Sequence, residues 1–150
     1  MSAAAGPILE VNNIEVVYNK AVQVLRGLSL AVPRGRIVAL LGSNGAGKST
    51  ALKAITGLLP LEDGELQAGQ IRFDGEPTGR VPPQALVRRG LAHVMEGRRV
   101  FEDLTVEENL VAATYALTGR KPLPRDFDAV YGYFPRLHER RKGLAGYLSG

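Results

Sequence analysis

A glycine-rich stretch holds the residues of this sequence that are best suited to chemistry, because it can wrap around a phosphate group. It reads Gly42-Ser43-Asn44-Gly45-Ala46-Gly47-Lys48-Ser49 and fits the spacing G-x-x-x-x-G-K-[ST]. Glycines allow the backbone to curl around an anion without Cβ clashes, so that successive N–H groups point inward. Lys48 can reach the β- and γ-phosphates, and the Ser49 hydroxyl can complete the ligand shell of a Mg²⁺ ion. The stretch therefore predicts a site for ATP, or a close relative, together with Mg²⁺.

The residues on either side predict the elements that hold this loop. Arg36–Leu41 (RIVALL) is a short, nearly continuous apolar run, which is typical of a strand buried on both faces of a parallel sheet. Ser49–Thr56 is expected to form a helix that ends at Gly57. The free N–H groups and positive dipole end of that helix would face the same phosphates. Thr50, in its first turn, completes the set of expected nucleotide contacts.

The rest of the chain alternates between expected strands and helices, with more helix in the C-terminal third. Leu58–Gln70 reads as a turn-rich connection, and Asp74-Gly75 as a hairpin turn. Thr105 and Glu108 have the spacing of a capping box at the start of a helix. Further strands are expected over 8–18, 22–32, 70–73 and 91–95, and further helices over 83–89, 105–116 and 126–134. The pattern indicates the α/β class.

Composition and charge narrow the possible functions. The 150 residues contain no cysteine, which excludes disulfides, thiolate metal sites and cysteine nucleophiles. The opening residues lack the basic segment and long apolar run of a signal peptide, so we expect none. No apolar stretch approaches the roughly 20 residues that span a bilayer. Basic residues concentrated over Arg120–Lys142 account for the net charge of +4 and could form either a nucleic-acid patch or a solvated helix face. We favour the solvated face and expect no nucleic-acid partner.

Three further stretches, taken with the loop, resemble the ATP-binding subunits of ABC transporters. The loop, GSNGAGKST, has the form typical of ABC-type ATPases. Upstream, Tyr18 matches the aromatic residue that stacks on adenine in this family, although it could also be an ordinary core or edge-strand residue. Downstream, LAHVMEGRRVFEDLTVEENL resembles the family's Q-loop segment, with Glu96 where most members have glutamine. Leu148-Ser149-Gly150 resembles the opening of the L-S-G-G-Q signature.

The resemblance implies a role for each of these positions. Lys48 and Glu96 would be the catalytic residues, and Glu96 would join Ser49 as a ligand of Mg²⁺, directly or through water. The alternative for Glu96 is an exposed loop carboxylate. Leu148-Ser149-Gly150 would contact the γ-phosphate held by the phosphate loop of a second subunit.

The family's remaining catalytic parts are not found among these 150 residues. They are the Walker B aspartate, the catalytic glutamate beside it and the switch histidine. His93 falls in an expected buried strand, and we expect it to be a core residue rather than a catalyst. We therefore expect this chain to bind ATP·Mg²⁺ without turning it over efficiently, because no residue is identified that orients the attacking water.

The resemblance also implies a fold and an assembly. The fold would be an incomplete P-loop NTPase of ABC type. It would have a mixed β-sheet core with an N-terminal antiparallel β part over about 1–95, and a partial helical subdomain over about 96–150. Members pair with a second ATP-binding subunit and with integral membrane permease subunits, and indirectly with a periplasmic or extracellular solute-binding protein. This implies a cytoplasmic location on the inner face of the cell membrane.

The stretch around Glu96 also bears on the transported solute. E-G-R-x-V-F-x-x-L-T-V-x-E-N-L looks like the ATP-binding subunit of branched-chain amino acid importers. Subunits for urea, amide or lipopolysaccharide transport are a second interpretation, against which Glu96 argues. A nucleic-acid-linked or regulatory ABC-type protein is a third, supported only by the basic stretch Arg120–Lys142. A P-loop kinase is a fourth, but the chain has no recognisable acceptor-binding lid.

Overall fold

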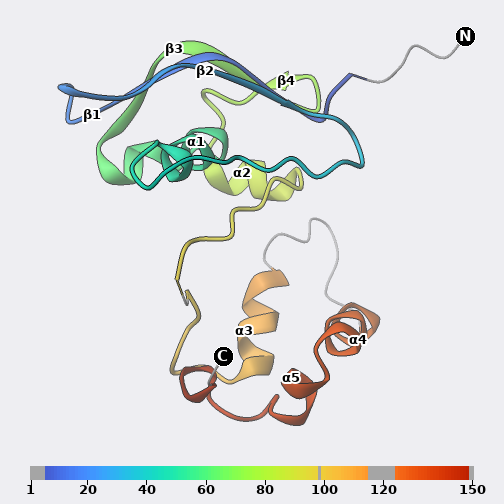
Figure 1. Ribbon diagram of the computed structural model, residues 1–150. Coiled ribbons are helices and arrows are strands. Elements are labelled where there is room, and N and C mark those ends of the chain that lie inside the picture. The colour runs from blue at the N-terminus through green and yellow to red at the C-terminus, as the bar shows by residue number, and fades with distance from the viewer. Residues whose placement is uncertain (1–5, 98, 115–123, 149–150) are drawn as a thin grey trace, which may run out of the picture. The chain divides into compact units, whose positions relative to one another are not determined.

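A computed structural model describes residues 6–97, 99–114 and 124–148 of the chain (Figure 1). The chain divides into two compact units, Met1–His93 and Val94–Gly150. The sequence places this boundary a few residues further along, near Glu96. Among the described residues, no helix is both long and apolar enough to cross a lipid bilayer.

The first unit is built on an antiparallel sheet with the strand order β2-β1-β3-β4. The strands are β1 (Leu9–Tyr18), β2 (Val22–Val32), β3 (Gly64–Phe73) and the short β4 (Glu76–Pro77). The two strands expected at the start of the chain are confirmed. The two strands pair along their whole length, with Leu9 opposite Val32 at one end and Tyr18 opposite Val22 at the other.

β3 is longer than the sequence predicts. It begins at Gly64 rather than Gln70, so the prediction of a connection over Leu58–Gln70 was wrong in its second half. Gly64 and Gly69 weaken the local preference for a strand, but pairing with β1 from end to end overrides it. The hairpin turn at Asp74-Gly75 is confirmed, with both residues in the left-handed region that such a turn requires.

A β-bulge at Asn12 and Asn13 divides β1 into two halves. Side chains alternate between the faces of a sheet, so one extra residue exchanges the faces beyond it. Leu9 and Val11 are buried before the bulge, whereas Ile14 and Val16 are buried after it. The buried residues have odd numbers before the bulge and even numbers after it. The bulge therefore turns all four side chains toward the core.

At this bulge, one residue in each of three neighbouring strands has a left-handed backbone conformation. Asn13 in β1, Gly27 in β2 and Gly69 in β3 have φ values of 49°, 84° and 85°. A Cβ on Gly69 would lie 2.4 Å from the Asn13 carbonyl oxygen, and one on Gly27 would lie 2.8 Å from Asn13 Oδ1. The Asn13 N–H donates to Ser29 Oγ at 2.8 Å. Only glycine therefore fits at position 69, where the close atoms belong to the backbone. At position 27 another residue would be strained by the positive φ and would displace the Asn13 amide group.

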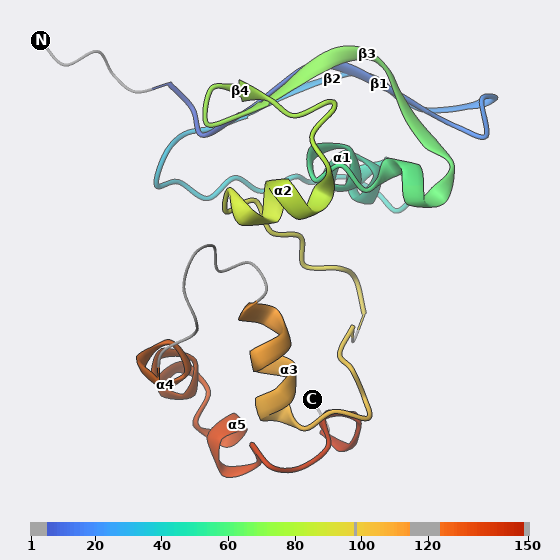
Figure 2. The same ribbon diagram turned by 180° about the vertical axis from the view of Figure 1, so that it is seen from behind.

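Two helices lie on one face of the sheet, as both views show (Figures 1 and 2). They are α1 (Lys48–Ile55) and α2 (Pro83–Arg88), and the 3₁₀ turn η1 (Leu59–Glu62) follows α1. Both helices were predicted, as were the glycines that end them, Gly57 and Gly90, which have positive φ. The buried core between helix and sheet consists of Leu9, Val11, Ile14, Val16, Leu25, Ala51, Ala54, Ile55, Leu59 and Ile71.

The two apolar runs expected to be buried strands are not strands. Within the described residues, neither Arg36–Leu41 nor Leu91–Met95 pairs with another strand. Ile37 is 100% exposed and Val94 is 93% exposed. A strand exists only where a neighbouring strand exchanges backbone hydrogen bonds with it, and the described part of the chain places none beside either run. The expected parallel part of the sheet is therefore not formed there, and only the antiparallel part is.

The second unit contains short helices. They are α3 (Val106–Ala113), α4 (Pro124–Tyr133), α5 (Pro135–Glu139) and the 3₁₀ turn η3 (Ala145–Tyr147). The helices expected over 105–116 and 126–134 are confirmed with shifted starts, at Val106 and Pro124, while residues 115 and 116 lie outside the described residues. The break expected at Pro135 is the start of α5, since proline is favoured at the first position of a helix.

The capping box of α3 is confirmed. Thr105 Oγ1 accepts from the Glu108 N–H at 3.2 Å, and Glu108 Oε2 accepts from the Thr105 N–H at 2.8 Å. The hydrogen bonds from the backbone and the hydroxyl of Thr105 lower the pKa of the Glu108 carboxyl. The segment after α5 also contacts this end of the helix, because the Val106 N–H donates to the Gly143 carbonyl at 3.0 Å.

Candidate functional site

The phosphate loop connects the exposed run Arg36–Leu41 to α1 within the first unit. Gly45 and Gly47 have φ values of 84° and 87°, which other residues rarely adopt. The Ala46 N–H donates to the Ser43 carbonyl at 3.2 Å and closes a turn at the tip of the loop. The loop therefore has the curled backbone that the glycine spacing predicts, with most of its residues exposed.

The Lys48 ammonium lies over the start of this loop. Its Nζ donates to the Gly42 carbonyl at 2.8 Å and to the Ser43 carbonyl at 2.7 Å. A phosphate oxygen would be a stronger acceptor than either carbonyl, because its charge strengthens the hydrogen bond. The flexible four-carbon stem of lysine allows the ammonium to move the short way from one to the other. Lys48 is thus already placed at the loop it is predicted to serve.

The start of α1 is open to an anion. Gly47 is its N-cap residue, and in this described stretch no side chain caps the helix and no acidic residue lies in its first turn. The first helical bond runs from the Ala51 N–H to the Gly47 carbonyl at 2.9 Å. The N–H groups of Lys48, Ser49 and Thr50 precede that bond, where a helix leaves its donors unused and its dipole favours negative charge. The Ser49 hydroxyl is exposed beside them. These residues fit a phosphate group.

A contact that the sequence does not reveal braces the loop from β2. A Cβ built on Gly47 would lie 2.6 Å from Leu25 Cδ2 and 3.6 Å from Val24 Cγ1. The missing side chain at Gly47 therefore has two uses. It permits the left-handed backbone, and it allows β2 to pack directly against the point where the loop becomes a helix.

Tyr18 lies at the end of β1 and is half-buried. A Cβ built on Gly64 would lie 2.9 Å from Tyr18 Cε1, so the ring rests on the start of β3. The tyrosine also packs against the core of the unit. Of the two alternatives for Tyr18, a core residue agrees with the structure and an edge-strand residue does not, because β1 pairs with a strand on either side. Stacking on adenine stays a prediction.

The remaining predicted site residues belong to the second unit or lie outside the described residues. Glu96 is exposed, and its carbonyl accepts from Arg99 Nε at 3.4 Å. Because Ser49 and Glu96 belong to different units, their shared role as Mg²⁺ ligands stays a prediction. The Leu148 N–H donates to the Ala145 carbonyl at 3.2 Å, whereas Ser149 and Gly150 lie outside the described residues.

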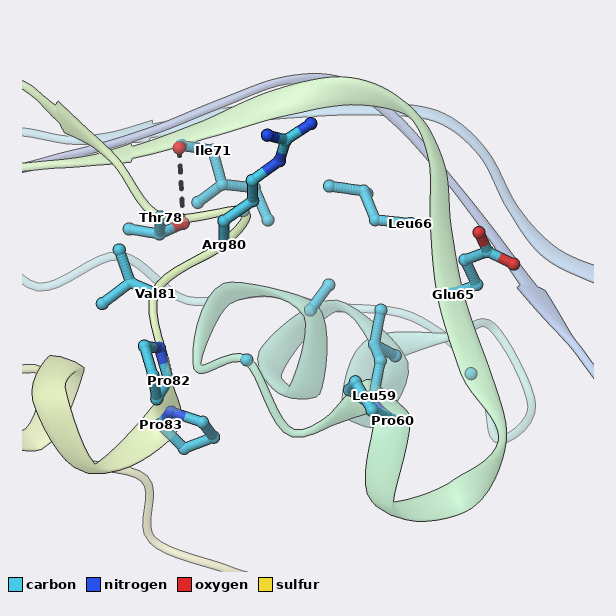
Figure 3. A pocket seen from close by; sticks show the side chains of 14 residues that line it. Leu59, Pro60, Glu65, Leu66, Ile71, Thr78, Arg80, Val81, Pro82 and Pro83 are labelled. Atoms are coloured by element: carbon cyan, nitrogen blue, oxygen red, sulfur yellow. Dashed lines mark hydrogen bonds between the residues drawn. The ribbon is translucent and has the colours of Figure 1, made fainter.

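A separate hollow of about 440 Å³ lies between β3 and the segment that leads into α2 (Figure 3). Leu66 and Ile71 line it from the sheet, and Val81 lines it from the segment before α2. One wall is fixed by the Thr78 hydroxyl, which donates to the Ile71 carbonyl at 3.3 Å. None of the predicted nucleotide contacts lines this hollow, so it is distinct from the phosphate loop.

The sequence of the chain matches a known family over most of its length. The family described as ABC transporter matches residues 25–148. The high-affinity branched-chain amino acid transport ATP-binding protein BraG of Pseudomonas aeruginosa is 39% identical over 143 residues, which are 95% of this chain and 58% of BraG. The probable branched-chain amino acid transport ATP-binding protein LivF of Archaeoglobus fulgidus is 35% identical over 131 residues, which are 87% of this chain and 53% of LivF. The chain thus spans little more than half the length of these relatives.

Solved structures agree with the sequence match. An ATP-binding subunit of an ABC transporter has a TM-score of 0.76 at 32% identity, over 95% of this chain and 56% of that one. The ADP conformation of MJ1267, an ATP-binding cassette of an ABC transporter, has a TM-score of 0.69 at 28% identity, over 96% of this chain and 59% of that one. The expected fold class, an incomplete P-loop NTPase of ABC type, is confirmed by these similarities.

Proposed function

Because the chain belongs to the ABC transporter family, we propose that it is the ATP-binding, energy-coupling subunit of an importer for branched-chain amino acids. Two relatives named for branched-chain amino acid transport support the choice of solute. The stretch that begins at Glu96 lies within these matches and has the E-G-R form that resembles the subunits of such importers.

The observation that carries the proposal is the open phosphate loop, with Lys48 Nζ within 2.8 Å of the loop carbonyls and α1 beginning without a side-chain cap. Four features of this loop would together bind a triphosphate and its metal ion. The curled backbone presents N–H groups, the helix presents its positive end, Lys48 supplies a full charge, and Ser49 supplies a hydroxyl for the metal. Such preorganised positive groups stabilise the charge that develops when a phosphoryl group is transferred.

We extend the proposal to Mg²⁺ and to hydrolysis by the whole protein. Mg²⁺ takes oxygen ligands and retains several waters, so the Ser49 hydroxyl and the Glu96 carboxylate suit it as partial ligands beside the phosphates. The metal would neutralise charge on the phosphates when bound. Lys48 and Glu96 are the residues of this chain that we assign to catalysis.

The proposed partners follow from the family. A second ATP-binding subunit would supply its own signature segment to the nucleotide held here, and Leu148-Ser149-Gly150 of this chain would do the same in return. Integral membrane permease subunits would hold the pair at the inner face of the cell membrane, and a solute-binding protein would act through them.

Two measurements test the proposal. Calorimetric titration of the chain with ATP and Mg²⁺ should give saturable binding, and a Lys48→Ala variant should bind at least ten-fold more weakly. Co-expression with the permease subunits of a branched-chain amino acid importer should give co-purification, and co-expression with those of a urea importer should not. Absence of ATP binding overturns the proposed activity, and co-purification with the urea permease alone overturns the proposed solute.

A further inference from the structure

The hollow between β3 and the segment before α2 has the size of a ligand site and lies wholly within the first unit. Its volume of about 440 Å³ falls within the roughly 300–1,000 Å³ that is usual for sites of small molecules. A second hollow of about 330 Å³ shares part of its lining, namely Leu66, Ile71, Gly79, Arg80 and Val81. None of the predicted nucleotide contacts lines either hollow, so a ligand here would be separate from ATP.

The walls of the larger hollow are mainly apolar and firmly held. Leu59 and Ile71 form part of its lining and are only 4% and 2% exposed, so the core itself supports the hollow. Three prolines that also line it, Pro60, Pro82 and Pro83, have backbones that the ring restricts. None of the residues that line the two hollows is aromatic, so neither offers a ring on which a nucleobase could stack. The apolar walls therefore suit an aliphatic group.

A tight turn places Arg80 at both hollows. The Val81 N–H donates to the Thr78 carbonyl at 2.9 Å, which closes a turn with Gly79 and Arg80 at its corners. Thr78 is buried and anchors the turn to β3, since its N–H donates to the Ile71 carbonyl at 3.0 Å. In Figure 3 the Arg80 side chain extends from this turn toward β3. Within the described residues, its guanidinium makes no hydrogen bond or ion pair.

We propose that this hollow binds a small aliphatic carboxylate. The Arg80 guanidinium presents a planar fork of donors that matches a carboxylate, and no acceptor in the described part of the chain occupies it. The aliphatic part would lie against Leu66, Ile71 and Val81, away from water. Glu65 also lines the hollow and would repel a doubly charged anion more strongly than a singly charged one. A monocarboxylate therefore fits better than a phosphate monoester.

Titration of the 150-residue chain with butanoate and hexanoate, followed by nuclear magnetic resonance without nucleotide, tests this site. Hexanoate should shift the amide signals of Ile71, Thr78 and Val81 in a saturable way. It should bind about fifteen-fold more tightly than butanoate, because each buried methylene group adds about four-fold. Hexanamide has the same aliphatic chain without the charge, and it should bind about five-fold more weakly than hexanoate, the effect of an exposed ion pair.

Two variants and one matched control assign the binding to the hollow. Arg80→Gln should bind hexanoate about five-fold more weakly and hexanamide as the wild type does. The control, Arg72→Gln, removes the same charge from β3, but Arg72 lines neither hollow and donates to Gln70 Oε1 and the Gly75 carbonyl. It should bind hexanoate within two-fold of the wild type.

The second variant, Gly79→Leu, places a side chain where the two hollows share a wall. Gly79 has no positive φ, and a Cβ there would meet nothing within 4 Å, so the variant should fold normally. The new side chain should take the space of the ligand and weaken hexanoate binding by at least ten-fold.

Several results would overturn the proposed site. They are the absence of saturable shifts, equal binding of hexanoate and hexanamide, equal losses in Arg80→Gln and Arg72→Gln, and unchanged binding in Gly79→Leu. Tighter binding of butyl phosphate than of butanoate would overturn the ligand class. The titrations contain no nucleotide, and Lys48→Ala should bind hexanoate as the wild type does. Failure of this site therefore leaves the proposed function standing, and failure of ATP binding leaves this site standing.

Discussion

Leu25 and Gly47 are in direct contact, since a Cβ on Gly47 would come within 2.6 Å of Leu25 Cδ2. Leu25 belongs to the buried core of the first unit, whereas Gly47 is the N-cap residue of α1. The sheet and the phosphate loop are therefore packed together at the point where the predicted anion site begins. The antiparallel sheet supports that site from one side. A change in either residue should therefore affect both the packing of the sheet and the binding of an anion at the loop.

Gly47→Ala should reduce both stability and ATP affinity. The new methyl group would meet Leu25, and the residue would keep a left-handed conformation that costs about 1–2 kcal/mol for a side chain. The free energy of unfolding, measured with urea, should fall by more than this backbone cost alone. In the double variant Gly47→Ala/Leu25→Ala, the shorter side chain at position 25 leaves room for the new methyl group. The free energy of unfolding should therefore fall by less than the sum of the two single losses.

Gly45→Ala is the matched control for this variant. Gly45 has a similar φ of 84°, but a Cβ there would meet nothing within 4 Å. It should show the backbone cost without the clash. Equal losses of stability in the two alanine variants would show that the contact with Leu25 has no effect.

Lys48→Ala should weaken ATP binding by at least ten-fold, because a charge-assisted hydrogen bond contributes about 1.5–3 kcal/mol. The control is Lys53→Ala, which removes the same charge from the same helix. Lys53 pairs with Glu62 at 2.6 Å rather than with the loop. Calorimetric titration should show affinity within about two-fold of the wild type for Lys53→Ala. A similar loss in both variants would mean that only net charge matters.

Thr105→Ala should reduce the free energy of unfolding of the second unit by about 1 kcal/mol, the usual cost of losing an N-cap. Glu108 makes the other half of this box, and its pKa is lowered in the folded chain. Its contribution is therefore present above the unfolded pKa and is lost as the pH falls through the folded pKa. The stability difference between wild type and Glu108→Ala should shrink on acidification in urea unfolding followed by circular dichroism. Glu108→Gln still accepts a hydrogen bond but does not titrate, and its stability should not follow this pH dependence.

Asn109→Ala should loosen the loop before α3. The Asn109 side chain accepts from the Phe101 N–H at 2.9 Å and donates to the carbonyls of Phe101 and Thr105 at 3.0 and 2.9 Å. Its loss should cost about 1–3 kcal/mol and speed amide exchange over 101–105. Asn109→Asp should be no better, because a carboxylate cannot donate to these carbonyls. Glu107→Gln, at an exposed position on the same helix, should stay within about 0.5 kcal/mol.

Those parts of the fold that depend only on residues close together in the sequence were predictable. The capping box at Thr105 and Glu108, the turn at Asp74-Gly75 and the phosphate loop are each contained in a few consecutive residues, so their residue types specify them. The bounds of β2 were predicted as they are observed, because this extended stretch is followed directly by the turn at Pro33-Arg34-Gly35.

Features that join distant parts of the chain could not be predicted in this way. Arg36–Leu41 has the composition of a buried strand, but composition does not supply the neighbouring strand on which the ladder depends. β3 was missed at its start because glycine weakens the local signal and the pairing with β1 is long-range. The contact of Leu25 with Gly47, and the hydrogen bond between Thr56 Oγ1 and His93 Nδ1, likewise bring together residues that nothing in the local sequence links.

The row formed by Asn13, Gly27 and Gly69 also limits how this chain can change during evolution. Gly27 and Gly69 both make room for Asn13, so we expect selection against replacing either glycine while the bulge at Asn13 remains. Loss of the bulge would in turn move the side chains of one half of β1 to the opposite face of the sheet. We therefore expect descendants of this sequence to retain or lose the three positions together, as one inherited unit spread over three strands.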